Sequence, residues 1–151
     1  MSADFVIYTD GSCLKNPGAG GWAAIIIDCE TGEVIELHDG TGQTTNNRME
    51  MTAAISALGK VPSNSTVELY TDSQYLKNAF TKGWIVNWKR NGWRTANGKA
   101  VLNQDLWLKL DKLMSSREVN LKWVKGHAGF NYNERCDELA RSEAAKFQKL
   151  H

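Results

Sequence analysis

A chain of 151 residues with a formal net charge of +1 has the size of a single domain and no overall field that would draw it to nucleic acid or to a membrane surface. No apolar run approaches the roughly 18 residues of a membrane span, and the N-terminus lacks the basic and apolar regions of a signal peptide. The three cysteines, Cys13, Cys29 and Cys136, form no Cys-x-x-Cys pair. They indicate neither a disulfide framework nor a zinc site, and they favour a reducing, cytoplasmic location. We predict one domain over residues 1–151.

The first predicted element is a buried strand that ends in a carboxylate. Residues Phe5–Tyr8 are β-branched or aromatic, which is typical of a central strand covered on both faces. Residues 10–12 then introduce turn chemistry, so Asp10 is expected at the carboxyl end of the strand, where open α/β sheets bind ligands. A lone Asp in this position would more simply hydrogen-bond to its own turn. A second strand, Val67–Thr71, also ends in an acid, Asp72, and this repetition favours a shared site.

Between these two strands the sequence predicts a loop, a hairpin and a helix. The glycine-rich residues 14–21 are expected to form a loop in which another molecule approaches the backbone closely. Two strands follow, separated by a short Gly-containing turn, over residues 22–27 and 33–38. Apolar side chains at helical spacing predict a helix over 51–58. Asn47 and Glu50 have the spacing of a capping box, which gives Glu50 a structural explanation beside any functional one.

The second acid-tipped strand leads into a short helix. Ser73 is expected to cap this helix over residues 74–80. Two strands that end in acids, with a helix between them, indicate a parallel crossover pair whose carboxyl ends are neighbours. Asp10 and Asp72 would then face each other at short range.

Residues 82–99 differ in character from the rest of the chain. They contain three of the six tryptophans and five cations, but no acid. Trp84 and Trp88 are four residues apart and share a helix face. One interpretation is a small satellite core with a solvated basic rim. The other is a nucleic-acid grip, in which cations bind phosphates and rings stack on sugars or bases, and the segment alone favours neither.

A helix and a strand follow this basic segment. Asn103 is expected to cap the helix. Its inner face should carry apolar side chains at helical spacing, namely Leu106, Leu110, Leu113 and Met114. Residues 119–124 alternate between apolar and polar side chains, which predicts a strand.

The C-terminal part adds two candidate functional residues. His127 lies in a glycine-flanked loop, and a loop histidine beside acids can transfer protons, although most such histidines have no special role. A final helix is expected from about Asn133, and it carries Asp137 beside its apolar face. For Asp137 the simpler explanation is an ion pair with Arg141, one helical turn later.

Four carboxylates are thus candidates for one site: Asp10, Glu50, Asp72 and Asp137. Four such charges at one rim would repel one another unless cations neutralised them. All-oxygen ligands select Mg²⁺ or Mn²⁺ over zinc, and two such ions can clamp an in-line displacement at a phosphate. The spacing indicates convergence most clearly for the two aspartates.

At this point the chain resembles type 1 ribonuclease H, in particular the bacterial single-domain enzymes. The matching segments occur in family order and extend over nearly the whole chain: Tyr8–Cys13, Thr44–Glu50, Thr71–Tyr75, Trp123–Gly129 and Asn133–Ala140. The resemblance implies a ribonuclease H-like α/β fold, with a mixed five-stranded sheet and helices on both faces. It also implies endonucleolytic cleavage of the RNA strand in RNA–DNA hybrids by two metal ions, which leaves 5′-phosphate and 3′-hydroxyl ends and supports removal of RNA primers and R-loops.

The resemblance also assigns roles to individual residues. Asp10, Glu50, Asp72 and Asp137 match the catalytic metal-binding acids, and His127 matches a loop histidine that assists proton transfer or product release. Other positions match substrate contacts to the minor groove, the RNA 2′-hydroxyls, a DNA phosphate and the DNA strand: Cys13, Asn16, Thr45, Asn46, Gln74, Trp84, Trp88, Lys89, Arg90, Trp93 and Arg94. The implied cofactor is Mg²⁺, with Mn²⁺ as a substitute.

The implied partner is an RNA–DNA hybrid duplex, with no membrane and no obligatory protein partner, so we expect a monomer. Two alternatives stay open at this stage. One is a module that binds hybrids without cleaving them, and the other is a different nuclease or integrase on the same fold.

Overall fold

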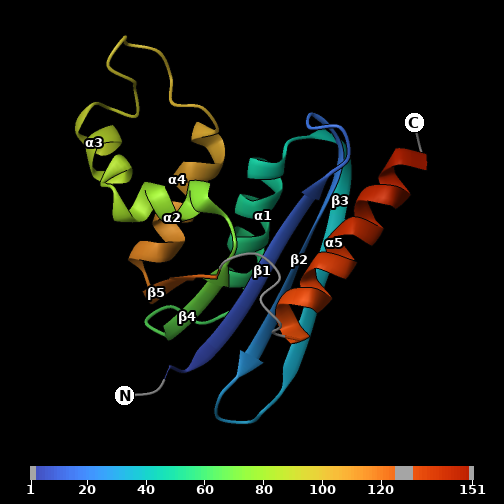
Figure 1. Ribbon diagram of the computed structural model, residues 1–151. Coiled ribbons are helices and arrows are strands. Elements are labelled where there is room, and N and C mark those ends of the chain that lie inside the picture. Colours follow the sequence, from blue (N-terminus) through green and yellow to red (C-terminus); the bar gives the residue numbers. More distant parts are fainter. Residues whose placement is uncertain (1–2, 125–130, 150–151) are drawn as a thin grey trace.

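The computed structural model of the chain describes residues 3–124 and 131–149. Five strands form one mixed sheet in the order β3-β2-β1-β4-β5 (Figure 1). Their bounds are β1 (Phe5–Cys13), β2 (Gly18–Asp28), β3 (Val34–Thr44), β4 (Thr66–Thr71) and β5 (Glu118–Trp123). The first three strands are antiparallel, whereas β4 and β5 continue the sheet in parallel from β1. The predicted α/β class and mixed five-stranded sheet are confirmed.

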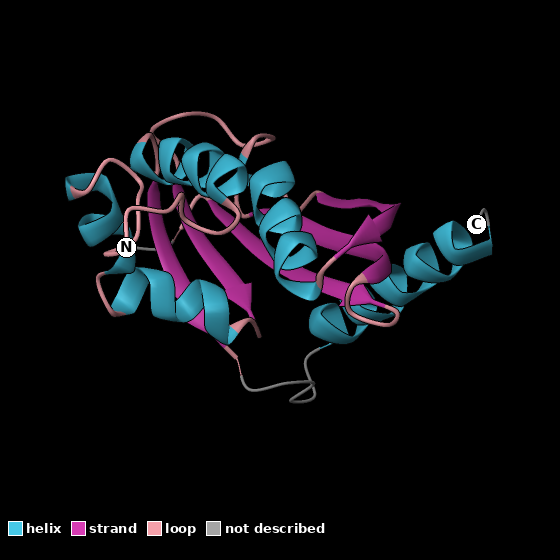
Figure 2. Ribbon diagram, turned by 90° about the horizontal axis from the view of Figure 1, so that it is seen from above, coloured by secondary structure: helices cyan, strands magenta, loops and turns pink. Residues whose placement is uncertain are grey.

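Helices cover both faces of this sheet (Figures 1 and 2). They are α1 (Asn46–Leu58), α2 (Gln74–Thr81), α3 (Trp84–Arg90), α4 (Gln104–Ser115) and α5 (Asn131–Lys149). Alternate residues of β2 divide between the two faces: Ala23 and Ile25 pack with α5, whereas Ala24 and Ile26 belong to the core beneath α1. Burial on both faces explains why this strand is a continuous apolar run. Within the described residues, we find no helix with the length and apolarity needed to cross a membrane.

The larger core lies between the sheet and helices α1, α2 and α4. Leu106 and Leu110 of α4 are buried there, as the helical spacing predicts, and Leu113 and Met114 pack against it partly buried. The largest fully buried side chain is Trp107, which the sequence analysis did not assign to the core. The tryptophan is compatible with this position because its indole N–H donates to the Tyr75 hydroxyl at 3.1 Å.

The predicted loop over residues 14–21 is corrected by the structure, because Gly18–Gly21 form the start of β2. The glycines do allow a close approach, but the approaching backbone is the protein's own. A Cβ atom on Gly21 would collide with the carbonyl oxygen of Ala140 and lie 2.7 Å from the backbone nitrogen of Ala144. The bare strand therefore lets α5 pack directly onto the sheet.

We expect Gly21→Ala to lower the free energy of unfolding by about 2–3 kcal/mol, because α5 has to shift to admit the methyl group. Urea denaturation measures this change. Gly59→Ala is the matched control: Gly59 has φ −66°, and its added Cβ would lie 3.3 Å from the nearest atom outside its neighbours. A loss in Gly21→Ala no larger than in this control would contradict the packing argument.

Candidate active site

Asp10 lies in β1 just past the point where this strand stops pairing with β4 while it still pairs with β2. Parallel pairing between β1 and β4 ends at Tyr8 and Tyr70, but antiparallel pairing with β2 continues, with Asp10 opposite Ala23 and Cys13 opposite Gly20. The predicted turn at residues 10–12 is therefore wrong, because the partner strand keeps β1 extended. Asp10 nevertheless lies beyond the end of the parallel pair, at the edge of the sheet where Asp72 follows β4.

Glu50 reaches the same edge from α1. The predicted capping box is wrong: the N-cap is Thr45, whose hydroxyl accepts from the backbone N–H of Arg48 at 3.2 Å. The helix thus begins before Asn47, and the Glu50 Oε1 atom accepts from the backbone N–H of Gly11 at 3.0 Å. A Cβ atom on Gly11 would lie 2.6 Å from the Glu50 nitrogen, so this glycine is what lets α1 approach β1.

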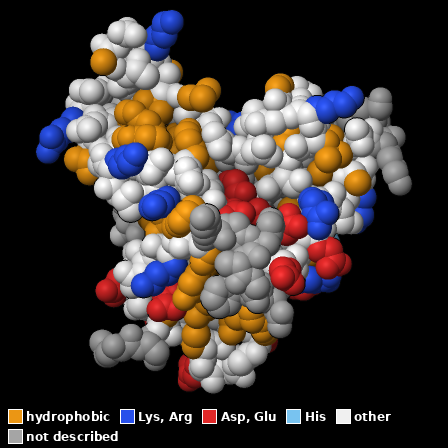
Figure 3. Space-filling model, in the orientation of Figure 1, with side chains coloured by type: hydrophobic (Ala, Val, Ile, Leu, Met, Phe, Trp, Pro, Cys, Tyr) orange, Lys and Arg blue, Asp and Glu red, His pale blue; other side chains and the backbone are white. Residues whose placement is uncertain are grey.

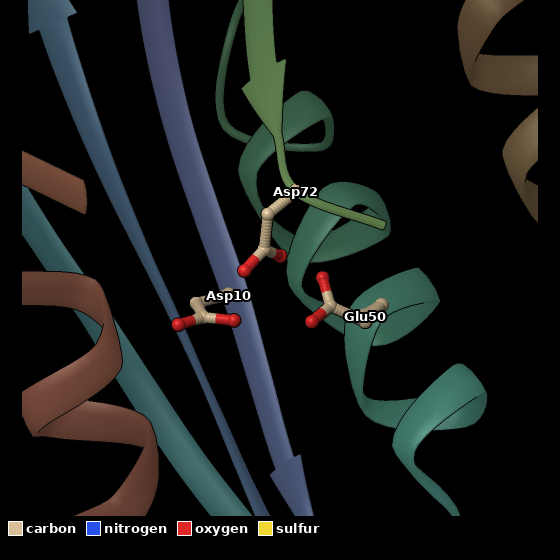
Figure 4. Close-up of side chains that lie close together, drawn as sticks. All are labelled: Asp10, Glu50 and Asp72. Carbon is tan, nitrogen blue, oxygen red and sulfur yellow. The ribbon is translucent and has the colours of Figure 1, made fainter. Parts of the chain in front are cut away.

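Asp10, Glu50 and Asp72 form a compact group of carboxylates (Figure 4). Each offers one oxygen, and these oxygens all lie within 4.8 Å of one another. Only 6% of Asp10 and 8% of Glu50 is exposed, and Asp72 is half-buried. The group lines a cavity of about 440 Å³, and acidic side chains gather near the middle of the face in Figure 3.

The structure places Asp137 at the border of this cavity. The residue lines the cavity from α5, but it is not one of the three mutually close carboxylates. Its Oδ2 atom also forms the ion pair with Arg141 that the helical spacing predicts, at 2.9 Å. The predicted ion pair is therefore confirmed, and the metal-binding role of Asp137 stays a prediction.

Burial disfavours the ionised forms of Asp10 and Glu50 in this cluster. The pKa of Asp10 is raised from 3.8 to about 7, first by burial and then by the charge of Asp72, against the opposing hydrogen bonds with Glu50 and the Gly11 N–H. The pKa of Glu50 is also raised well above its usual range, by burial and by the charges of Asp10 and Asp72. Moreover, Glu50 Oε2 is buried and has no hydrogen-bond partner in the part of the chain that the structure describes. A cation bound at these carboxylates would offset the raised pKa of both acids.

These residues fit a hard divalent cation. Three carboxylates supply only oxygen donors, which is the ligand set of Mg²⁺ and Mn²⁺, and the unpartnered Glu50 oxygen is available for coordination. Cys13 also lines the cavity, but burial raises the pKa of its thiol and its Sγ donates to the Thr44 carbonyl oxygen at 3.4 Å. It therefore remains a neutral thiol and offers no soft thiolate ligand. His127 lies outside the described residues.

Several of the predicted substrate contacts surround the acids. Cys13, Asn46 and Gln74 line the same cavity. Asn16 is adjacent, since its Oδ1 atom accepts from the backbone N–H of Asn46 at 3.1 Å. Thr45 caps α1 immediately before Asn46. The sequence-predicted contacts to RNA thus lie together on one rim, next to the carboxylates.

The tryptophans of the basic segment pack against the main core as a cluster of rings, here called the tryptophan cluster. Trp88 packs against Trp84, Trp93 and Trp107, with ring centroids 5.9, 6.3 and 5.4 Å away. Their neighbouring cations lie on the surface, where Lys89 pairs with Asp111 at 3.1 Å. The other two predicted cationic contacts, Arg90 and Arg94, are exposed. The tryptophans therefore extend the main core beneath a solvated basic rim and form no separate satellite core, and the nucleic-acid grip stays a prediction.

Two supporting residues were not identified from the sequence. The indole N–H of Trp123, at the end of β5, donates to the Asp72 carbonyl oxygen at 3.2 Å and so fixes the backbone that carries this acid. Tyr75 lines the cavity beside Gln74. In the sequence, Trp123 is an aromatic residue at the end of a predicted strand, and Tyr75 follows the predicted contact Gln74. Neither position indicates a role until the packed helices and strands bring the side chain to the site.

A second hollow, of about 490 Å³, lies at the other end of β1 and is lined by Asp4, Asp28, Cys29 and Glu30 among others. Its aspartates already bind backbone groups: Asp4 accepts from the Thr66 N–H at 3.0 Å, and Asp28 accepts from the Glu30 N–H at 2.9 Å. These acids have structural roles, so we place the candidate active site at the cluster of Asp10, Glu50 and Asp72.

The fold and these residues define an α/β protein with a cluster of three carboxylates, able to hold a cation, at the edge of a mixed sheet. The sequence matches the family model described as RNase H over residues 2–145. It is 55% identical over 141 residues to Ribonuclease H of Rhodopseudomonas palustris (strain BisB5), covering 93% of this chain and 92% of that protein. It is 50% identical over 145 residues to Ribonuclease H of Nitratidesulfovibrio vulgaris (strain DP4), covering 95% and 90%. The chain belongs to the ribonuclease H family.

Solved structures agree with this assignment. LC9-RNase H1, a type 1 RNase H with the type 2 active-site motif, superposes with a TM-score of 0.82 at 29% identity, covering 97% of this chain and 74% of that one. The structure of LC11-RNase H1 in complex with RNA/DNA hybrid has the same fold, with a TM-score of 0.68 at 24% identity, covering 94% and 97%. The ribonuclease H-like fold expected from the sequence is thus confirmed.

Proposed function

We propose that this protein is an endoribonuclease that hydrolyses the RNA strand of RNA–DNA hybrids and leaves 5′-phosphate and 3′-hydroxyl ends. The observation that carries the proposal is the group of three carboxylates within 4.8 Å of one another, in a family whose curated members are named Ribonuclease H. Removal of RNA primers and R-loops is the cellular role that such an activity would support.

In the proposed site, Asp10, Glu50 and Asp72 would hold Mg²⁺, or Mn²⁺ as a substitute, and Asp137 would complete the set from α5. When bound, two such ions supply Lewis-acid stabilisation of the attacking and leaving oxygens of the phosphate. The Gly11 N–H keeps one oxygen of Glu50 oriented toward β1, and the Trp123 indole holds the backbone at Asp72. Both contacts preorganise the carboxylates. His127 is proposed to transfer a proton or to assist product release.

Recognition of the hybrid is assigned to the rim of the cavity. The side-chain amides of Asn16, Asn46 and Gln74 can donate to and accept from a 2′-hydroxyl, the group that distinguishes RNA from DNA, and Cys13 lies beside them. Thr45, at the N-terminus of α1, is assigned to a DNA phosphate. The tryptophan cluster is proposed to contact the DNA strand together with its basic rim, through Trp84, Trp88, Lys89, Arg90, Trp93 and Arg94.

A labelled RNA–DNA hybrid tests this function directly. We expect cleavage of the RNA strand with Mg²⁺, none with a chelator, and none of DNA duplex or RNA duplex of the same sequence. In the same assay we expect His127→Ala to slow turnover without abolishing it. Binding of the hybrid without products would favour a non-catalytic hybrid-binding module, and cleavage of DNA duplex would favour another nuclease on this fold.

We further propose that residues 1–151 act as one domain, as a monomer, in the cytoplasm. All three cysteines are free in the structure, and Cys29 is exposed, which is compatible with a reducing compartment. Sedimentation of the protein with and without hybrid tests the proposed stoichiometry.

A further inference from the structure

Arg48 connects α1 with the beginning of α4. Its guanidinium donates to both carboxylate oxygens of Asp105, at 3.0 and 2.8 Å, and Nη1 also donates to the Asn103 Oδ1 atom at 3.2 Å. A bidentate ion pair of this kind fixes the relative orientation of the two side chains as well as their distance. The neighbouring guanidinium lowers the pKa of Asp105 to about 2, so the pair is charged throughout the neutral range.

Asn103 continues this connection toward α2. The residue precedes α4, as the sequence predicts, but it makes no side-chain cap bond and has φ +62°, a left-handed conformation that Asn tolerates better than most residues. Its Nδ2 atom donates to the Tyr75 hydroxyl at 3.2 Å, and the Trp107 indole donates to the same oxygen at 3.1 Å. The hydroxyl of Tyr75 is therefore held by two donors from the α4 region.

The two ends of this chain of hydrogen bonds lie close to the proposed recognition amides. Arg48 is two residues from Asn46, the first residue of α1, and Tyr75 directly follows Gln74, the first residue of α2. Asn46, Gln74 and Tyr75 all line the carboxylate cavity. The α4 region thus joins the two helix starts that carry the amides.

We infer that Arg48, Asp105, Asn103 and Tyr75 form a positioning network, here called the Arg48 network, that sets the separation between Asn46 and Gln74. This inference rests on the proposed function, because it gives these amides the task of reading hydroxyl groups spaced regularly along an RNA strand. Groups that bind substrate equally in the ground state and the transition state contribute to KM, whereas kcat depends on the acids. Loosening the network should therefore weaken hybrid binding and leave the chemical step nearly unchanged.

Tyr75→Phe and Arg48→Lys test the network with little loss of packing or charge. Tyr75→Phe removes the hydroxyl that accepts from both Asn103 and the Trp107 indole. Arg48→Lys replaces the bidentate guanidinium pairing by a single ammonium. We expect each variant to raise KM for the hybrid about tenfold, which is on the scale of one hydrogen bond, with kcat changed less than about twofold. Because both act through one connection, the double variant should be little worse than either single variant.

Glu36→Gln is the matched control. The two carboxylate oxygens of Glu36, in β3, also accept from one arginine, from Nε and Nη2 of Arg135 at 2.8 and 3.2 Å. Glu36 does not line the carboxylate cavity. We expect its KM to match that of the wild type. An unchanged KM in the two network variants, a fall in kcat instead, additive effects in the double variant, or an equal change in Glu36→Gln would overturn the inference.

Binding measured without cleavage separates this inference from the proposed function. Fluorescence anisotropy of a labelled hybrid, with chelator present, should show about tenfold weaker binding by both network variants. If the wild type binds the hybrid but does not cleave it with Mg²⁺, weaker binding by the variants supports the network while the proposed catalysis fails. If the wild type neither binds nor cleaves the hybrid, both proposals fail.

Discussion

Asp10→Asn is expected to reduce cleavage of an RNA–DNA hybrid at least about a thousandfold, the scale on which removal of one charge-stabilising group acts in other enzymes. The same change should raise the melting temperature in metal-free buffer, because it removes a buried negative charge beside Asp72 and Glu50. A gain of about 1 kcal/mol would appear as a rise of about 2–4 °C in a chain of this size. Steady-state cleavage and calorimetry of the same preparation measure both effects.

Asp39→Asn is the control for this substitution. Asp39 and Asp10 both lie in strands, and the Oδ1 atom of each accepts from the N–H of the following glycine at 2.8 Å. Asp39, however, is exposed and lies outside the carboxylate cavity. We expect Asp39→Asn to keep wild-type cleavage and to gain no stability. Retained cleavage by Asp10→Asn would remove Asp10 from the site and with it the proposed chemistry.

The second large effect is a dependence of stability on pH that Mg²⁺ should suppress. The pKa of Asp10 is raised from 3.8 to about 7 by burial and by the charge of Asp72, so the native state binds this proton more tightly than the unfolded chain does. The stability linked to Asp10 is fully present below pH 4 and is lost as the pH rises through 7. Three pKa units correspond to a loss on the order of 4 kcal/mol, and Glu50 acts in the same direction.

Urea denaturation between pH 4 and pH 8, with chelator or with excess Mg²⁺, measures this dependence. We expect the metal-free protein to lose stability over this range and Mg²⁺ to restore it at pH 8, since a bound cation replaces the proton. Asp10→Asn should have a smaller slope and keep the part that comes from Glu50, because burial is the first cause of the raised pKa of Glu50. An unchanged slope in that variant would show that Asp10 does not contribute to it. An equal gain from Mg²⁺ at both ends of the range would show that the three carboxylates are not the origin of the slope. The pKa of Asp105 is lowered to about 2, so that residue affects stability only below pH 4.

The site itself shows how far sequence patterns lead. Two short apolar segments that each lead into an acid predict that Asp10 and Asp72 are neighbours, and the parallel pairing of β1 with β4 confirms this although β1 continues past Asp10. The orientation of Glu50 was not predictable in this way, because the Asn47–Glu50 spacing fits a capping box equally well. The packing of α1 over Gly11 decides the matter. Likewise, only the assembled cavity shows that Asp137 lies beside the other acids while it pairs with Arg141.

The sequence by itself determined the α/β class, the approximate elements and the cap of α2, because periodicity and capping chemistry act between residues that are near in the chain. Ser73, for example, accepts from the Leu76 N–H as expected. The tertiary structure decided that β1 continues past Asp10, that Gly18–Gly21 form a strand and that Trp107 is central to the core. Each of these depends on a partner far away in the chain, and local preference yields to such contacts because strand pairing and burial outweigh the propensity of a few residues.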